Sequence, residues 1–460
     1  MTEKAKRQRQ HEQDPMVRRM NFDAVESNLT PEQVKLEADR CLHCKNARCV
    51  TGCPVNINIP EFIAAIKEDN LEKAGEVIRE TSLLPSVCGR VCPQERQCEG
   101  KCVLGIKGEA IAIGALERYV GDNTDAKAEV APETGKKVAI IGSGCAGITA
   151  AADLRKAGHK VVVFEALHKL GGVLRYGIPP FRLPRKFLDR ELNALRNMGV
   201  EFYTNVVVGK SITIQQLKDD GYDAIFICSG AGLPKMLNIP GENLNGVYSA
   251  NEFLTRVNLM HANRGDAPTP LKTGKRAIIV GGGNVAMDAA RVAVRVGFES
   301  VKIVYRRTEA ELPARLEEIR HAKEEGVVFQ FLHNPVELTG ENGFVNKAKL
   351  EIMELGEPDE SGRRSPVPTG QYVEEDVDTF IVALGTGPNP IIQSSVSSEG
   401  LNLETDRKGY IVIDAATGKT TIDGVYAGGD VAPTGTSNAI NAMGAGKRAA
   451  AAINEYLKTK

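Results

Sequence analysis

One glycine-rich loop constrains the fold of this chain more than any other feature. An apolar segment, 138–141, runs into a Gly-x-Gly-x-x-Gly loop at 142–147, and residues 148–157 have a helix-forming composition. A second apolar segment, 161–164, ends on Glu165. This order is typical of a dinucleotide-binding unit, in which the glycines let the backbone approach a pyrophosphate and the acid binds ribose hydroxyls. The predicted contacts are Gly142, Gly144, Ala146, Gly147 and Glu165.

The same arrangement returns later in the chain with one change. An apolar segment, 276–280, runs into a Gly-x-Gly-x-x-Ala loop at 281–286, but the next segment, 300–305, ends on Arg306 and Arg307. Guanidinium groups at this place favour NADP over NAD because they pair with its 2′-phosphate. A solvated charge pair is the alternative. The first site therefore suits FAD and the second NADPH, with predicted contacts Gly281, Gly283, Asn284, Val285, Arg306 and Arg307.

Eight of the ten cysteines fall into two dense runs near the N-terminus. The runs read C-x2-C-x4-C-x3-C-P and C-x3-C-P-x4-C-x3-C, which suits cubane iron–sulfur clusters better than secreted disulfides. Zinc is the alternative because Cys-x2-Cys also opens zinc sites, although eight thiols exceed one tetrahedral site. Spacing alone selects Cys41, Cys44, Cys49, Cys53, Cys88, Cys92, Cys98 and Cys102.

The segments around these cysteines have helical patterns. Residues 30–33 form a capping box with proline at the first helical position, a second start follows Asn58, and residues 71–80 carry apolar side chains at helical spacing. We expect a small α-helical domain that needs its clusters as staples. The charged residues before it predict a solvated tail, and the polar stretch 121–135 predicts a linker.

Glycines in three other segments suggest further cofactor contacts. Residues 169–184 are too rich in glycine and proline for a regular element, as expected where backbone lies against a flat cofactor; a connecting loop without function is the alternative. Apolar segments at 379–384 and 424–428 also end in glycine. In a flavoprotein the second would place a helix N-terminus and a carboxylate near the flavin's ribityl and phosphate end. The predicted contacts are Gly172, Arg182, Gly385, Gly429 and Asp430.

The bulk properties exclude several functional classes. The formal net charge of the 460 residues is -1, which gives no indication of nucleic acid or anionic lipid as a partner. The longest apolar runs, such as 380–384, are far shorter than the roughly 20 residues that cross a bilayer. The N-terminus has no apolar signal segment. We therefore expect a cytoplasmic α/β protein without a membrane span.

Together, these motifs resemble the small (β) subunit of NADPH-dependent glutamate synthase. They are also similar to the large subunit of NADH-dependent reduced ferredoxin:NADP oxidoreductase, to sulfide dehydrogenase and to the N-terminal half of dihydropyrimidine dehydrogenase. Besides the cysteines and the first loop, the resemblance rests on residues 176–184, 283–288, 305–308 and 427–430. It implies an α/β fold with an N-terminal α-helical iron–sulfur domain and two Rossmann-like domains, the NADP domain inserted in the FAD domain. The expected domains are 1–125 for two [4Fe–4S] clusters, 136–245 with 385–460 for FAD, and 246–384 for NADP.

The resemblance also implies the cluster ligands. One cluster would be held by Cys41, Cys44, Cys49 and Cys102, and the other by Cys53, Cys92, Cys98 and Glu117, which leaves Cys88 as a bystander. NADPH would pass a hydride to the flavin, and electrons would leave singly through the clusters. This chemistry needs no side-chain nucleophile or acid–base pair, so no catalytic residue is predicted.

The partner that receives the electrons differs between two hypotheses. The first is the input subunit of glutamate synthase, working with a larger FMN-containing subunit, because this chain has no length for a barrel of roughly 250 residues and cannot make glutamate alone. The second is a subunit of an electron-bifurcating transhydrogenase with a small ferredoxin-reductase-type flavoprotein and, as a further partner, ferredoxin. A third hypothesis, a cluster-carrying scaffold, is disfavoured by the intact glycine loops.

Overall fold

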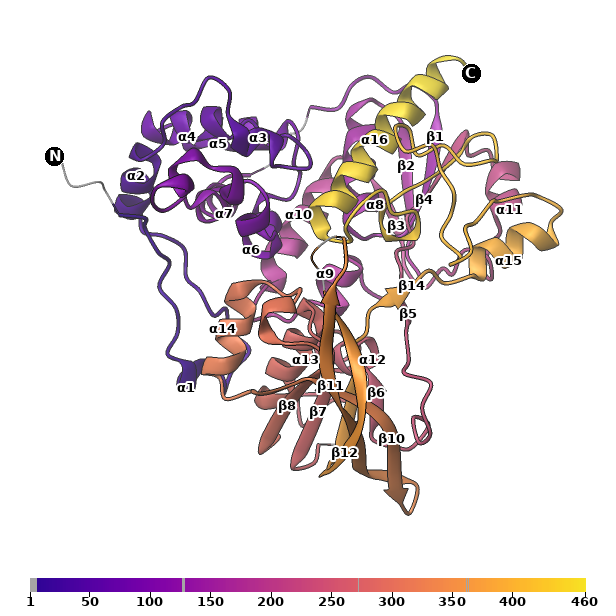
Figure 1. Cartoon of the computed structure of the whole chain (residues 1–460). Helices are drawn as coiled ribbons and strands as arrows, with labels where there is room; N and C mark the ends of the chain where they lie inside the picture. The colour runs from indigo at the N-terminus through magenta and orange to yellow at the C-terminus, as the bar shows by residue number, and fades with distance from the viewer. Residues whose placement is uncertain (1–5, 126–128, 272, 361, 363) are drawn as a thin grey trace.

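The computed structural model describes residues 6–125, 129–271, 273–360, 362 and 364–460. They form a helical N-terminal part and two parallel sheets with flanking helices, joined at one central junction (Figure 1). This arrangement confirms the expected fold class. The stretch expected to link the helical part to the first sheet includes residues 126–128, which lie outside the described residues.

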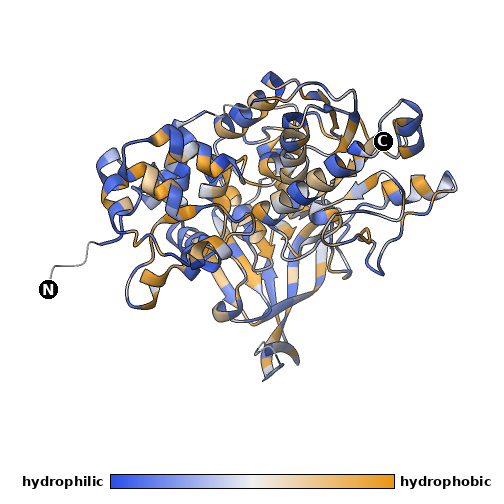
Figure 2. Ribbon diagram, turned by 90° about the horizontal axis from the view of Figure 1, so that it is seen from above, coloured by the Kyte–Doolittle hydropathy of each residue, from blue (hydrophilic) through white to orange (hydrophobic). Residues whose placement is uncertain are grey.

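The N-terminal part is helical, as the capping signals predict. Thr30 and Gln33 form a reciprocal capping box, in which Thr30 Oγ1 accepts from Gln33 N at 3.2 Å and Gln33 Oε1 accepts from Thr30 N at 2.9 Å. In Figure 2 the helices near the N-terminus carry both orange and blue residues, as expected for helices that bury one face. No helix among the described residues is long and apolar enough to cross a membrane. The elements are α2 (Pro31–Asp39), α3 (Arg48–Thr51), α4 (Ile59–Lys67), α5 (Leu71–Arg79), α6 (Pro85–Val91), η1 (Gln94–Arg96), η2 (Glu99–Lys101), η3 (Val103–Ile106) and α7 (Ile113–Asn123).

The first parallel sheet is completed by the C-terminal segment of the chain. Its strand order is β15-β4-β1-β2-β3. β15, from the C-terminal segment, therefore pairs with β4, the last strand of this sheet before the chain enters the second sheet. The strands are β1 (Lys137–Ile141), β2 (Lys160–Phe164), β3 (Glu201–Tyr203), β4 (Ala224–Ile227) and β15 (Val425–Ala427). The helices and turns of this part are α8 (Cys145–Lys156), α9 (Val173–Tyr176), α10 (Arg185–Asn197), α11 (Ile214–Asp219), α15 (Ile391–Ser398), η5 (Gly429–Val431) and α16 (Ala439–Lys458). Short α9 lies within residues 169–184, where no regular element was expected.

The second parallel sheet lies between the two halves of the first in sequence. Its strand order is β6-β13-β7-β8-β9. The chain passes between the two sheets twice, and the two connecting segments pair with each other through the short antiparallel strands β5 and β14. The elements are β5 (Leu233–Pro234), β6 (Val247–Ser249), α12 (Ala250–Asn258), β7 (Arg276–Val280), α13 (Asn284–Arg295), β8 (Ser300–Tyr305), η4 (Glu309–Glu311), α14 (Leu316–Glu324), β9 (Val328–Phe331), β13 (Thr379–Val382) and β14 (Thr386–Gly387). An antiparallel sheet of β10 (His333–Glu341), β11 (Phe344–Pro358) and β12 (Arg364–Asp376) was not expected, and it extends away from the junction (Figure 1).

Residues 6–30, here called the N-terminal segment, correct the expectation of a solvated tail. Arg7 Nη2 pairs with Glu99 at 2.7 Å in the helical part. The segment then runs to α1 (Pro15–Arg18), which lies beside α14 of the second sheet (Figure 1). There Arg18 is buried, and its Nη2 pairs with Glu324 at 2.6 Å. The segment therefore connects the helical part to the second sheet through ion pairs that are distant in sequence.

The carboxylate of Glu325 anchors this connection. It is fully buried and accepts from Arg18 Nε at 3.0 Å, Arg291 Nη2 at 2.8 Å and Arg295 Nη1 at 2.6 Å. Burial alone would raise the pKa of Glu325, but hydrogen bonds from Arg295 and Arg291 outweigh it and lower the pKa to about 2. Glu325 therefore stays ionised and holds three guanidinium groups from the N-terminal segment and α13.

We expect Glu325→Gln to destabilise the protein by about 3–5 kcal/mol, because it removes the charge that compensates buried arginines. Urea unfolding at neutral pH measures this. Glu324→Gln is the matched control. The Glu324 carboxylate is partly exposed, so its loss should destabilise the protein by only about 0–1 kcal/mol. Because the folded pKa of Glu325 is depressed, its contribution is complete above pH 4.5 and is lost as pH falls towards 2. The Gln variant should lack this acid-dependent component, and equal costs for both variants would contradict the assignment.

Candidate functional site

The first cysteine group lines one cavity in the helical part. Cys41 and Cys44 follow α2, Cys49 lies in α3, and Cys102 lies between η2 and η3. The rest of the wall is mostly apolar and includes Ile59, Ile63, Ile111 and Ile113. Burial, followed by the charges of the neighbouring thiols, raises the pKa of Cys41 and that of Cys49, the latter to about 11. A bound metal ion would reverse this by stabilising thiolates, so four thiols around one apolar cavity fit an iron–sulfur cluster.

The second group consists of Cys53, Cys92, Cys98 and Glu117. Burial raises the pKa of Glu117 to about 8. Burial is also the main cause that raises the pKa of Cys53 and that of Cys98, and the Glu117 charge adds to the rise at all three thiols. Glu117 Oε1 is buried and has no hydrogen-bond partner among the described residues. A buried carboxylate oxygen without a partner is costly, and ligation to a metal would satisfy it. The residues present therefore fit a second cluster with one oxygen ligand.

Cys88, which spacing alone selects as a ligand, lies next to this group. Its Sγ is 3.5 Å from Met443 Sδ on α16 and 3.9 Å from Ser82 Oγ. A hydrogen bond with Cys88 is the main cause that raises the pKa of Cys92. Cys88 thus lies between the second group and α16, and the choice between Cys88 and Glu117 as the ligand stays a prediction.

Two glycines of the first loop permit close packing against the backbone, and the third leaves open space beside it. Gly142 has φ +114°, and a Cβ there would lie 2.5 Å from Cys228 O. A Cβ on Gly147 would lie 2.0 Å from Gly142 O. A Cβ on Gly144, by contrast, would meet no described atom within 4 Å. Gly144 at the start of α8 is therefore where backbone can lie against a pyrophosphate, as a dinucleotide site requires.

Three other segments converge on this loop. Glu165, directly after β2, accepts from Ser143 N at 3.0 Å. Gly172 has φ +52° and lies beside Gly144, and Gly429 has φ +73° and lies beside Ala146. Asp430 accepts from Ser437 Oγ at 2.6 Å. A cavity lined by Gly429, Asp430, Thr436, Asn441 and Arg448 extends to Pro54, the residue after Cys53.

The second loop shows the same division of roles. A Cβ on Gly281, which has φ +138°, would lie 2.3 Å from Ala383 O, whereas one on Gly283 would meet no described atom within 4 Å. Asn284 and Val285 begin α13, and Gly385 has φ +89° with similarly open surroundings among the described atoms. The second loop therefore also fits a dinucleotide.

The structure separates the two arginines that follow β8. Arg306 is exposed. Arg307 is buried, and its Nε donates to Arg364 O at 3.0 Å. The two guanidinium groups therefore lie in different surroundings, one in solvent and one bonded within the protein. Arg306 is the better placed of the two to reach a ligand, and both assignments stay predictions.

Arg182 lies away from the first loop, in contacts with the second sheet's helices. It is buried, with Nη1 2.7 Å from Asp288 Oδ2 on α13 and Nε 2.7 Å from Glu318 Oε1 on α14. These contacts tie residues 169–184 to the second unit. A role for Arg182 at a cofactor stays a prediction, and the structure adds an interdomain role that the sequence could not indicate.

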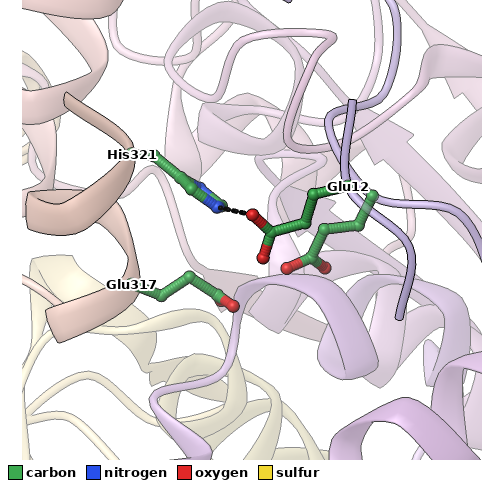
Figure 3. Close-up of side chains that lie close together, drawn as sticks. Glu12, Glu317 and His321 are labelled. Carbon is green, nitrogen blue, oxygen red and sulfur yellow. Dashed lines mark ion pairs between the residues drawn. The ribbon is translucent and has the colours of Figure 1, made fainter. Parts of the chain in front are cut away.

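A group of Glu12, Glu26, Glu317 and His321 was not expected from the sequence (Figure 3). Their ligand atoms lie within 4.8 Å of one another, as in some metal sites. Each carboxylate has a guanidinium partner, however: Arg320 at 2.6 Å from Glu12, Arg118 at 3.2 Å from Glu26 and Arg315 at 3.2 Å from Glu317. We interpret this group as a contact between the N-terminal segment, α7 and α14.

Comparisons with known proteins agree with this geometry. Residues 18–129 match the family described as dihydropyrimidine dehydrogenase domain II, 4Fe-4S cluster, and residues 136–446 match the pyridine nucleotide-disulphide oxidoreductases. The chain is 35% identical to the glutamate synthase [NADPH] small chain of Escherichia coli, over 96% of this chain and 95% of the relative. It is 37% identical to the NADP(+)-dependent formate dehydrogenase subunit beta of Moorella thermoacetica, over 90% of this chain and 60% of the relative. The fold resembles Mycobacterium tuberculosis FprA in complex with NADPH, with a TM-score of 0.56 and 24% identity over 71% of this chain and 84% of that chain.

We expect Gly144→Ala to fold but to lose flavin, because its methyl group occupies the space where the backbone approaches the pyrophosphate. Gly283→Ala should retain flavin and weaken NADPH binding by about tenfold or more, equivalent to about 1.4 kcal/mol. Flavin absorbance of the purified proteins and NADPH titration measure both effects. Gly265→Ala is the control, since its Cβ would also meet no described atom within 4 Å but it lies outside both loops. Normal flavin in Gly144→Ala would refute the first assignment.

The two candidate ligands of the second group can be separated by substitution. Glu117→Ala should lower the iron content or change the electron paramagnetic resonance of one cluster, because it removes an oxygen ligand. Cys88→Ala should keep both, because it removes contacts with Ser82, Met443 and Cys92 but no ligand. Iron analysis and the spectra of the reduced proteins provide the measurement. Iron loss in Cys88→Ala with a normal Glu117→Ala would reverse the assignment.

Proposed function

Because the chain belongs to the family of the small chains of NADPH-dependent glutamate synthase, we propose that it feeds electrons from NADPH to a larger catalytic subunit that makes glutamate. The chain is an oxidoreductase whose cofactors are FAD, NADPH and [4Fe–4S] clusters. When bound, these groups supply hydride and electron transfer, and the protein supplies their positions.

The proposal divides the chain by cofactor. Residues 1–125 hold two clusters, residues 136–245 and 385–460 hold FAD, and residues 246–384 hold NADP. The first cluster takes Cys41, Cys44, Cys49 and Cys102, and the second takes Cys53, Cys92, Cys98 and Glu117. The support is the first group's shared cavity, the buried Oε1 of Glu117 and the two open glycines, Gly144 and Gly283.

One observation supports an order of the proposed cofactors. The cavity beside the first glycine loop is lined by Gly429 and Asp430 on one side and by Pro54, next to Cys53, on the other. The proposed flavin site therefore adjoins Pro54, next to the second cysteine group, whereas the first group lines a different cavity. This order makes the second cluster the acceptor from the flavin and the first cluster the exit.

A second candidate is supported by the relative from Moorella thermoacetica. That protein is a formate dehydrogenase subunit, and this chain matches 60% of its length. The same type of chain thus occurs beside another catalytic partner. The alternative function is therefore electron exchange with a different partner, including a small ferredoxin-reductase-type flavoprotein in a bifurcating enzyme. In either case we propose the cytoplasm as the location, because a reducing compartment preserves the free thiols.

The deciding experiment is anaerobic purification of the native protein from its source, followed by mass spectrometry of what remains bound. A large partner with an FMN-binding barrel would support the glutamate synthase proposal. A small flavoprotein would support bifurcation instead. Bleaching of the flavin absorbance by NADPH tests the shared part of both proposals, and a protein that NADPH fails to reduce would contradict them.

Arg306→Gln should lower kcat/KM for NADPH by about 10- to 100-fold, because a charged hydrogen bond to a phosphate contributes about 1.5–3 kcal/mol. Activity with NADH should be unchanged. Arg276→Gln is the control. This exposed arginine begins β7, whereas the glycine loop follows the end of β7, and it pairs with Asp376 and Asp378. Flavin reduction by each nucleotide provides the measurement, and equal losses for both nucleotides would refute a role for Arg306 at the 2′-phosphate.

A further inference from the structure

Residues 312–315 connect the second glycine loop to the cysteine-bearing part of the chain. On the side of the glycine loop, Ala314 N donates to Gly282 O at 3.2 Å. Arg315 N donates to Asn284 Oδ1 at 2.9 Å. Asn284 directly follows Gly283, the glycine with open surroundings. This segment therefore hydrogen-bonds to the residues on both sides of Gly283, where we propose that the pyrophosphate binds.

The same residues bind the loop that carries two cysteines of the second group. Arg315 Nη1 donates to Arg90 O at 3.1 Å, and Nη2 donates to Gln94 Oε1 at 2.9 Å. In return, Arg96 Nη1 donates to Pro313 O at 3.1 Å and Nη2 to Ala314 O at 3.2 Å. The residues of the cysteine loop in these contacts are Arg90, Gln94 and Arg96. They lie on either side of Cys92 and precede Cys98 in the sequence. Two guanidinium groups, one from each side, thus lock the two segments together.

The contact continues from Gln94 into the second cysteine group. Gln94 Nε2 donates to Cys88 O and Gly89 O, each at 3.2 Å. Gln94 also packs on α7, where a Cβ on Gly114 would lie 2.5 Å from its Nε2. Gly114 lies one turn before Glu117 on α7. A displacement of Arg315 would therefore reach both the thiols and the carboxylate of this group.

Burial makes this connection stiff. Arg315 is 8% exposed, and its guanidinium also faces Glu95 at 3.4 Å and Glu317 at 3.2 Å. Hydrogen bonds from charged groups in such surroundings are among the stronger ones in proteins. A nucleotide that shifts Asn284 or Gly282 by a fraction of an ångström would thus shift the cysteine loop as well.

We propose that Arg315 is a positioning residue that couples the occupancy of the NADP site to the environment of the second cluster. This inference rests on the proposed function, because it assumes a nucleotide at 281–285 and a cluster at Cys92 and Cys98. Coupling between two sites is reciprocal in free energy. Bound NADP+ therefore changes the cluster's reduction potential, and reduction of the cluster changes the affinity for NADP+ by the same factor.

The test is a redox titration of the holoprotein, followed by electron paramagnetic resonance, with and without saturating NADP+. In the wild type we expect a potential shift that corresponds to a coupling factor of about 5-fold or more; a tenfold factor is 59 mV for one electron. In Arg315→Gln the factor should fall to within about twofold of unity, since twofold is only about 0.4 kcal/mol. Arg276→Gln, an exposed arginine of the same unit, should retain the full shift.

If Arg315→Gln folds poorly, a second variant, Arg96→Gln, and a second measurement, hydrogen exchange, test the same coupling. Arg96→Gln removes the opposing guanidinium at an exposed position and should weaken the coupling. Hydrogen exchange of the 88–98 peptide should slow on NADP+ addition in the wild type and respond less in either variant. A wild type that binds NADP+ without a potential shift, or variants that keep the shift, would overturn the coupling. A wild type that does not bind NADP+ at all would overturn the proposed function along with it.

Discussion

The buried carboxylate of Glu325 fixes the relation between the parts of this molecule. It draws Arg18 of the N-terminal segment onto Arg291 and Arg295 of α13, and so ties the helical part to the second sheet. Arg182, within residues 169–184, makes buried ion pairs with Asp288 and Glu318, and Arg315, directly before α14, donates to Arg90 O of the cysteine loop. Ion pairs of this kind add little net stability against their desolvation cost, but they fix geometry because misplacing one partner leaves a buried charge. Transfer between bound cofactors needs that fixed geometry.

Sequence reasoning was accurate where the physics is local. A capping box, a glycine that must adopt positive φ and an apolar strand are decided within a few residues, so the loop at 142–147 and the helix after Thr30 were predicted from their own composition. The N-terminal segment was misread because charged residues favour solvent unless distant partners exist, and Glu324 and Glu325 are such partners. The antiparallel sheet was missed because register shifts, as between Pro335 and Glu337, interrupt the alternation that identifies strands.

The candidate site shows the same limit at the level of single side chains. The sequence placed Arg306 and Arg307 at the end of β8, but only the structure distinguishes an exposed guanidinium from one bonded to Arg364 O. Spacing gives Cys88 the same standing as its neighbours, and only the structure shows that its sulfur contacts both Met443 and Cys92. The direction of a side chain depends on which element packs against its strand or helix, so the local sequence does not determine it. Arg315 carries no motif at all, and its position became evident only from the contacts it joins.

The two interfaces around the proposed cofactors use different chemistry. The first sheet's helices meet through small residues, since a Cβ on Gly446 of α16 would lie 2.3 Å from Ala146 O, and a Cβ on Gly444 would lie 3.5 Å from Pro54 O. Such close packing has no alternative arrangement of similar energy, so it suits cofactors that stay bound. The second unit instead contacts the cysteine loop through the guanidinium groups of Arg96 and Arg315, whose directional hydrogen bonds join the two segments. Directional hydrogen bonds of this kind transmit a displacement from one segment to the other, as the proposed coupling between an exchanging nucleotide and the second cluster requires.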